Sequence, residues 1–455
     1  MARSPRQKAA GKAVRQQARI AHIGMIDLDG GFRERRLAVA DIDKVFGPGG
    51  TFCNVVNQWD VSDAVFGPGP FVGEAVWIDP ASARPYPFES GAIMLLAEYT
   101  GDQAETVPRA VLRRQVECAA KLGVVVKTAF EFEWLVYDET AKSLRDKEFM
   151  RLTPWAVDNR CWDGLSAPIY AEPICELEAL LRDGGIGLLG LGMELGPGCL
   201  EGTLAATDAI GAADEAALFK LYTKAFFRRR NQTAVFMSQP DANAPGLSGH
   251  IHLSLRDKRG RNLFYDADGP DCMSATMRHF IGGVLALLPD CLALPLHTVN
   301  AYRRLSPGNW APRTATWSVQ NYSTAIRAVT DNANLCRLEF RLPGADVHPH
   351  LALAMLLGTG LWGMEQRIEP PVPVISDGRV DVPVGTRILP HDLRLAAEAL
   401  SGSKVAAGLS ATHLSSGSPS RAAMNSTHCN ARLVLPRKPA ISKRCRPHHP
   451  HHSAG

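Results

Sequence analysis

The sequence predicts an α+β protein in which a small, sheet-rich N-terminal domain precedes a larger domain built on an antiparallel sheet. Between residues 21 and 100, short apolar runs alternate with turns rich in Gly, Pro and Asp, which is typical of short strands. Residues 107–123 have helical spacing, with Pro108 near the start and Gly123 at the end, so we expect a helix to open the large domain. Beyond it, strand and helix patterns mix without the regular alternation of a doubly wound parallel sheet.

Composition and charge exclude several classes of protein. The chain has 455 residues, of which 45% are hydrophobic and 21% charged, as in ordinary globular proteins. Its net charge of +4 comes from the C-terminal end, because residues 413–455 contain seven Lys or Arg and no Asp or Glu. The remainder of the chain is slightly acidic, so we expect no nucleic-acid partner.

We also do not expect a membrane protein or a secreted protein. No apolar run reaches the roughly 18–20 residues that a membrane helix needs, and the N-terminus lacks the apolar core of a signal peptide. Ten cysteines occur without a CxxC pair, which favours reduced thiols and a cytoplasmic location. No GxxxxGK[ST] motif is present, so phosphate must be held in another way.

Three segments show an alternation of polar and apolar residues that places chemically reactive side chains on one face of a strand. Their apolar rows contain Phe, Trp, Ile and Leu and would lie on the opposite, buried face. The polar rows are Glu131 and Glu133; His250, His252 and Ser254; and Arg337, Glu339 and Arg341.

A half-solvated antiparallel sheet would explain any one of these segments, but solvated faces usually carry Lys, Thr and Ser. Carboxylates at Glu131 and Glu133 repel each other unless positive charge lies between them. Oxygen ligands with one imidazole suit Mg²⁺ or Mn²⁺ better than zinc. Glu194 and Glu201, which flank a Gly-Pro-Gly turn, add two more carboxylates to the predicted metal site.

These motifs, in this order, resemble the glutamine synthetase family over about residues 20–375. Upstream, the segments around Asp27 and Trp59-Asp60 are similar to the N-terminal β-grasp domain of that family. The matching motifs of the catalytic part are Glu131-Phe-Glu133, Glu194 to Glu201, Gly246 to Ser254, Asn300 to Gly308, Arg337 to Arg341 and the closing Ile368-Glu-Pro-Pro371.

The resemblance implies a β-grasp domain at residues 21–104 and a catalytic domain at 105–411, whose curved antiparallel sheet is flanked by helices. A basic segment, 1–20, precedes them, and an atypical tail, 412–455, follows; the tail has no acid and no aromatic residue and is predicted to be disordered. The resemblance also implies a homo-oligomer, in the family a dodecamer of two hexameric rings, with active sites between the β-grasp domain of one subunit and the catalytic sheet of its neighbour. The unusual tail puts the dodecamer in question.

The resemblance assigns site residues by matched position. One metal would be held by Glu133, Glu194 and Glu201, and a second by Glu131, His250 and Glu339. ATP would lie near His252, Ser254 and Arg337. Glutamate would be held by Arg304, Arg341 and the backbone of Gly246, with Arg327 facing the transferred phosphate and Asp60 orienting or deprotonating the amine.

The implied reaction is an ATP-dependent ligation. The γ-carboxylate of glutamate attacks the γ-phosphate of ATP, and an amine then displaces phosphate from the acyl phosphate. Because charge develops on phosphoryl oxygens, two or more Mg²⁺ or Mn²⁺ ions and arginines would provide the stabilisation.

The sequence departs from the family pattern at four positions. Trp310 stands where glutamine synthetases place a glutamate over the ammonium site, Tyr322 where an Arg is usual, Gln239 where a Lys is usual, and Cys199 where a Gln is usual. An indole cannot deprotonate ammonium but offers an apolar wall. We therefore expect an organic amine as substrate. The alternatives to an organic-amine ligase are a glutamine synthetase that uses ammonia and a non-catalytic, oligomeric member of the family.

Overall fold

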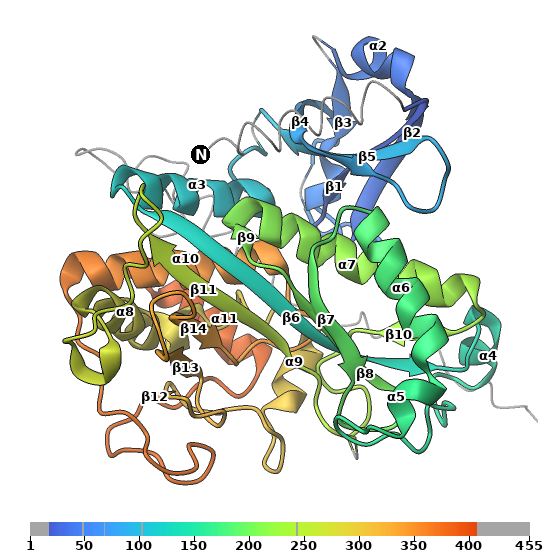
Figure 1. Cartoon of the computed structure of the whole chain (residues 1–455). Helices are drawn as coiled ribbons and strands as arrows, with labels where there is room; N and C mark the ends of the chain where they lie inside the picture. The colour runs from blue at the N-terminus through green and yellow to red at the C-terminus, as the bar shows by residue number, and fades with distance from the viewer. Residues whose placement is uncertain (1–17, 48–49, 68, 102, 243, 407–455) are drawn as a thin grey trace, which may run out of the picture.

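The computed structural model describes residues 18–47, 50–67, 69–101, 103–242 and 244–406 (Figure 1). Most of the expected basic segment, residues 1–17, and the whole expected tail, 412–455, lie outside the described residues. None of the helices in the described ranges is long and apolar enough to cross a membrane.

The N-terminal sheet has five strands in the order β2-β1-β5-β4-β3. The β1–β5 pair is parallel and the other neighbours are antiparallel. One short α-helix, α2 (Ile42–Phe46), and two 3₁₀ turns, Val39–Asp41 and Asn54–Asn57, lie between the strands. The strands are β1 (Ile20–Ile26), β2 (Phe32–Ala38), β3 (Thr51–Cys53), β4 (Gly73–Pro85) and β5 (Ala92–Tyr99).

The larger sheet follows the order β12-β13-β14-β11-β6-β8-β7, with β9 and β10 also paired to β6. The β12–β13 pair is parallel and the other pairs are antiparallel. With the helices around it, this sheet confirms the predicted α+β class. The strands are β6 (Val125–Tyr137), β7 (Leu188–Met193), β8 (Cys199–Leu204), β9 (Thr207–Asp208), β10 (Thr233–Val235), β11 (Gly249–Arg256), β12 (Trp317–Val319), β13 (Ile326–Val329) and β14 (Arg337–Phe340).

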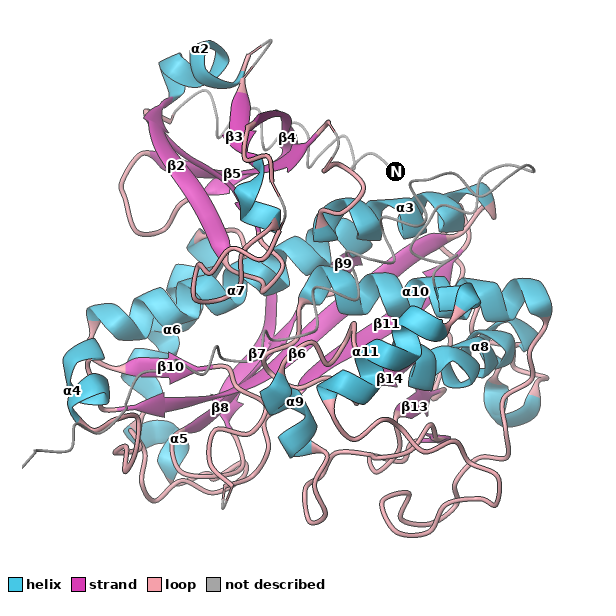
Figure 2. Cartoon of the chain, turned by 180° about the vertical axis from the view of Figure 1, so that it is seen from behind, coloured by secondary structure: helices cyan, strands magenta, loops and turns pink. Residues whose placement is uncertain are grey.

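Helices α7, α8 and α10 cover one face of the large sheet (Figure 2). The helix expected at 107–123 is α3, which begins at Pro108 and ends at Lys121. A 3₁₀ turn, Pro270–Cys272, precedes α8. The helices are α3 (Pro108–Lys121), α4 (Ala141–Asp146), α5 (Ser166–Ile169), α6 (Ala171–Asp183), α7 (Ala209–Arg229), α8 (Ala275–Cys291), α9 (Val299–Arg304), α10 (Pro349–Gln366) and α11 (Leu393–Gly402).

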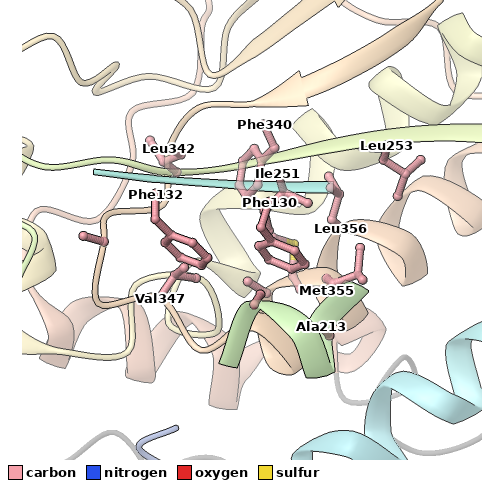
Figure 3. Packing of buried hydrophobic residues seen from close by; sticks show 14 of the residues in the cluster. Phe130, Phe132, Ala213, Ile251, Leu253, Phe340, Leu342, Val347, Met355 and Leu356 are labelled. Carbon is pink, nitrogen blue, oxygen red and sulfur yellow. The ribbon is translucent and has the colours of Figure 1, made fainter. Parts of the chain in front are cut away.

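The apolar rows of the three patterned strands form the core beneath these helices. Phe130 and Phe132 of β6 are fully buried and point toward α7 and α10, as Figure 3 shows. Ile251 of β11 and Phe340 of β14 are equally buried beside them. Burying a side chain of this size contributes roughly 1.5–3 kcal/mol, so the core fixes which face of each strand carries the polar row.

A buried arginine links the N-terminal sheet to helix α7. Arg109 of α3 donates two hydrogen bonds to Asp214 of α7, at 2.8 and 2.9 Å. It also donates to Asp79 of β4 at 2.7 Å and to Glu98 of β5. His350 of α10 lies 3.0 Å from Asp214 through its Nε2. Burial opposes ionisation of Asp214, yet Arg109 and His350 hold its pKa well below the usual range. One guanidinium therefore contacts carboxylates of the N-terminal sheet and of a helix that covers the large sheet.

Replacing Arg109 with Met should destabilise the protein strongly, because Asp214, Asp79 and Glu98 would stay buried after losing the positive charge that all three share. Removing one partner of a buried ion pair costs about 3–5 kcal/mol. Arg182→Met is the matched control, since Arg182 pairs with Glu178 on the exposed face of α6 and surface pairs contribute at most about 1 kcal/mol. Urea unfolding of both variants measures the difference, and equal losses would contradict a central role for Arg109.

Candidate active site

Strand register brings the predicted polar rows together on one face of the large sheet. The central strand β6 lies between β11 and β8. His250 stands opposite Glu131 across the β11–β6 pair, and Glu201 stands opposite Glu133 across the β6–β8 pair. Glu339 of β14 pairs in register with His252. Because side chains at directly opposed positions lie on the same face, four strands contribute to one site.

One group of three residues is close enough to share a metal ion. Ligand atoms of Glu131, His250 and Glu339 all lie within 4.8 Å of one another. Nδ1 of His250 is 3.1 Å from Glu131 and 3.3 Å from Glu339. The second oxygen of Glu131 accepts a hydrogen bond from Thr203 at 3.0 Å. These are the three residues that the family resemblance assigns to a single metal.

Of the other three predicted ligands, Glu133 and Glu201 lie on the same face and Glu194 follows the end of β7, and these three do not form so compact a group within the described residues. Glu133 accepts a hydrogen bond from the backbone N–H of Ser248 at 2.7 Å. Glu194 accepts one from its neighbour Leu195 at 2.8 Å and one from the Cys161 thiol at 2.9 Å. Burial, followed by repulsion from Glu131, Glu133 and Glu194, raises the pKa of Glu201 to about 9. The carboxylates are thus near enough to repel one another strongly.

The donor atoms on this face fit a hard divalent cation. Burial raises the pKa of Glu133, an effect that the charge of Arg304 offsets only in part, and burial together with neighbouring carboxylates raises the pKa of Glu201. The Nε2 atoms of His250 and His252 are buried without a hydrogen-bond partner in the described part of the chain. Burial, then the charge of Arg341, lowers the pKa of His250 to about 4, which keeps its imidazole neutral as a metal ligand must be. Carboxylate oxygens with one imidazole are ligands typical of Mg²⁺ or Mn²⁺.

Guanidinium groups surround Glu339. One of its oxygens accepts from Arg327 at 2.8 Å and the other accepts from Arg341. Burial acts to raise the pKa of Glu339, but His250 and Arg341 lower it to about 2. Because each carboxylate oxygen has two lone pairs, Glu339 can accept hydrogen bonds from both arginines and still coordinate a cation.

Two further arginines lie at the predicted positions beside the cluster. Arg304 of α9 is buried, and its guanidinium donates to the Leu342 carbonyl at 2.9 Å. Burial lowers the pKa of Arg304 to about 10. Arg337 donates to Nδ1 of His252 at 3.3 Å. Ser254, also predicted near ATP, is buried on β11 in register with Lys127.

Gln239 stands where the family usually has Lys, and its side chain is held by hydrogen bonds to neighbouring loop residues. Its side-chain amide donates to the carbonyls of Asp241 and Ala244 at 2.6 and 2.7 Å. Its oxygen accepts from Asn309 at 3.1 Å. A Cβ added at Gly246 would lie 2.8 Å from that same oxygen and 2.8 Å from Arg304, so the backbone of Gly246 passes close to both. Gln239 therefore ties together the two loops beside Arg304.

Trp310 lines two cavities. One, of about 540 Å³, is also lined by Gln239 and Gly246. The other, of about 630 Å³, is also lined by Tyr322 and Arg379. The guanidinium of Arg379 stacks 4.1 Å from the centre of the indole ring. The side chain of Trp310 is 57% exposed, so it is accessible to a ligand in either cavity.

Asp60 is not part of this assembly within one chain. Its carboxylate accepts from the backbone N–H groups of Ser62 and Ala64 at 2.8 and 3.0 Å. It lines a different cavity, of about 670 Å³, together with Asp29 and Lys220. The expected role of Asp60 in the site of a neighbouring subunit remains a prediction.

Some side chains that contact the candidate ligands could not be recognised from a pattern in the sequence. Thr203 and Cys161 contact the candidate ligands Glu131 and Glu194, yet Cys161 follows no repeating pattern. Cys199, one of the four departures, is fully buried on β8, and burial raises its pKa well above the usual range. Only the fold brings these thiols near the carboxylates.

Comparison with known proteins assigns the fold and site to a family. The sequence profile described as "Glutamine synthetase, catalytic domain" matches residues 105–415. The chain belongs to the glutamine synthetase family. It is 33% identical to type-1 glutamine synthetase 2 of Dictyostelium discoideum over 84% of this chain and 75% of that protein. It is 29% identical to the glutamate–isopropylamine ligase of a Pseudomonas species, covering 82% of this chain and 84% of the relative.

The fold agrees with this assignment. A solved structure described as a GmaS–ADP complex superposes with a TM-score of 0.79 at 25% identity, covering 93% of this chain and 94% of that one. Membership in the family makes the protein an ATP-dependent C–N ligase of the γ-glutamyl type. ATP and divalent metal ions are the usual requirements of this family.

The raised pKa of Glu201 predicts a pH-dependent stability in metal-free buffer. A carboxyl with a pKa of about 9 in the folded protein and about 4.5 in the unfolded chain holds its proton on folding. Its contribution to stability is therefore present below about pH 4.5 and is lost as pH rises toward 9. Glu201→Gln removes this loss, so the variant should gain stability over the parent by about 1 kcal/mol per pH unit between pH 7 and 9.

Urea unfolding at several pH values, with chelator present, measures this difference. Glu365→Gln is the control, because Glu365 is exposed near the end of α10. A parallel pH dependence of the parent and Glu201→Gln would show that Glu201 does not bear the repulsion.

Proposed function

We propose that this protein joins the γ-carboxylate of glutamate to an organic amine, through γ-glutamyl phosphate and at the expense of ATP. The observation that carries the proposal is the position of Trp310. Its indole lines both a cavity that includes Gly246, whose backbone passes close to Arg304, and a cavity that includes Tyr322 and Arg379. The relative that acts on isopropylamine supports an organic amine in this family.

The proposal includes Mg²⁺ or Mn²⁺ as the cations. Glu131, His250 and Glu339 would hold one ion, and Glu133, Glu194 and Glu201 another. When bound, such ions supply positive charge that stabilises the phosphoryl oxygens in the transition state. The burial of Glu133 and Glu201 near other carboxylates, and the grouping of ligand atoms of Glu131, His250 and Glu339 within 4.8 Å of one another, support this assignment.

The protein's own residues perform the positioning steps. The buried cationic side chains of Arg304 and Arg341, with the backbone of Gly246, bind the glutamate carboxylates. Arg327, only 13% exposed, points its charge at the phosphoryl group as negative charge develops there. His252, Ser254 and Arg337 line the ATP side. Asp60 of a neighbouring subunit would orient the amine or accept its proton, so the proposed enzyme is a homo-oligomer.

The indole changes what the amine site favours. Without a carboxylate at position 310, ammonium loses both a charge partner and a base. An alkyl or aryl amine instead gains apolar contact with the ring of Trp310. Burying one side chain's worth of apolar surface is worth roughly 1.5–3 kcal/mol, or about 10- to 150-fold in selectivity if it is realised in the transition state.

A panel of amines tests this proposal directly. We expect phosphate release with glutamate, ATP and Mg²⁺ to show a higher kcat/KM for an organic amine than for ammonia. Trp310→Glu should shift the ratio toward ammonia by about tenfold or more. Trp77→Glu is the matched control, since its ring also carries a stacked guanidinium, that of Arg113 at 5.4 Å, on the N-terminal sheet. A preference for ammonia in the unmodified protein would make glutamine synthesis the better assignment.

A second substitution tests the cation assignment. Glu133→Gln preserves the shape of the side chain but removes its negative charge, so phosphate release should fall by at least about a hundredfold at saturating Mg²⁺. The substitution removes a repelling charge, so metal-free stability should stay level or rise. Comparison of phosphate release with urea unfolding separates the two effects. Normal turnover in the variant would refute the role of Glu133 as a ligand.

A further inference from the structure

We propose that Tyr322 is a positioning residue, whose aromatic ring holds Arg327 and Arg341 in the arrangement that phosphoryl transfer requires. The inference rests on the proposed function, because those two arginines act on phosphate and glutamate there. It concerns a position where the family usually has an arginine and where this chain has a ring.

Both guanidinium groups lie against the same ring. The guanidinium carbon of Arg327 is 4.0 Å from the ring centre of Tyr322, and that of Arg341 is 5.1 Å away. The backbone carbonyl of Tyr322 also accepts a hydrogen bond from Nε of Arg341 at 2.9 Å. The ring and the main chain of one residue therefore contact both arginines.

The same two arginines also meet at Glu339. Each donates to a different oxygen of that carboxylate, so two positive charges are gathered around one acid. The two guanidinium groups carry like charges, which repel each other, and the carboxylate of Glu339 cancels only part of that repulsion. The negative face of the Tyr322 ring attracts cations within about 6 Å of its centre, so it offsets part of that repulsion without adding a charge.

Both terminal nitrogens of Arg327 donate hydrogen bonds, and the ring of Tyr322 contacts the face of the same guanidinium. Its second terminal nitrogen donates to Gln320 at 2.7 Å, and Nε is buried without a hydrogen-bond partner in the described chain. Gln320 and Tyr322 lie in the same loop after β12, so this short segment sets the direction of Arg327. An arginine at position 322 would instead bring a third guanidinium beside the first two.

The ring also borders the cavity on the Arg379 side of Trp310. It is 54% exposed, so its outer edge is open to that cavity while it contacts the two arginines. Tyr322 thus lies between a cavity bordered by Trp310 and the arginines proposed to act on phosphate and glutamate. A change of ring at this position should act on the chemical step, not on the stability of the fold.

The experiment compares Tyr322→Phe, which keeps the ring, with Tyr322→Leu, which removes it. With Mg²⁺, ATP, glutamate and a saturating amine, we expect kcat of Tyr322→Phe to stay within about twofold of the parent. We expect kcat of Tyr322→Leu to fall about tenfold, with a smaller change in KM for ATP. Tyr265→Leu is the control, because Tyr265 lies in the segment after β11 and packs against the core. It should lose no kcat.

A second measurement does not depend on turnover. The rate at which phenylglyoxal labels Arg327, followed by peptide mass spectrometry, should rise several-fold in Tyr322→Leu and stay unchanged in Tyr322→Phe. Equal labelling and equal kcat in both variants would overturn the inference. If the unmodified protein showed no ligase activity but labelling still followed the ring, the proposed function would fail while the positioning of the arginines would stand.

Discussion

Mutual repulsion among the carboxylates on one face of the large sheet governs much of this structure. Hydrophobic burial of Phe130 and Phe132 on the opposite face holds the strands in place despite that repulsion. The charge is then compensated in two different ways. Around Glu339 the protein supplies its own cations, whereas around Glu201 it retains a proton that a bound metal ion would replace. Without a bound metal ion the folded protein is less stable, because the carboxylates proposed to bind that ion repel one another.

The faces of the central strands could be predicted because strand geometry is local. Alternation at Glu131 and Glu133 depends only on the pleat of β6, and Pro108 marks the start of α3 by its missing N–H. The family resemblance added the grouping of Glu131 with His250 and Glu339. That grouping depends on strand order and register, which no single segment of the sequence contains.

Other features could not be predicted because they arise in loops that meet only after folding. The sequence shows that Tyr322 and Gln239 differ from the family, but not that one contacts two guanidinium groups and the other ties two loops together. The stacking of Arg379 on Trp310 likewise joins segments almost 70 residues apart. Such contacts follow from tertiary packing and leave no periodic pattern.

The contacts of Arg109 bear on how this framework acquires new substrates. Its guanidinium contacts acids of the N-terminal sheet and of helix α7 in the protein interior, so moving the N-terminal sheet away from α7 would expose several charges at once. Such a movement is therefore an unfavourable way of resizing a site. Under the proposed function, adaptation to bulkier or smaller amines is more readily made in the loops that carry Trp310 and Arg379, where residues can be exchanged while the N-terminal sheet and α7 keep their contacts.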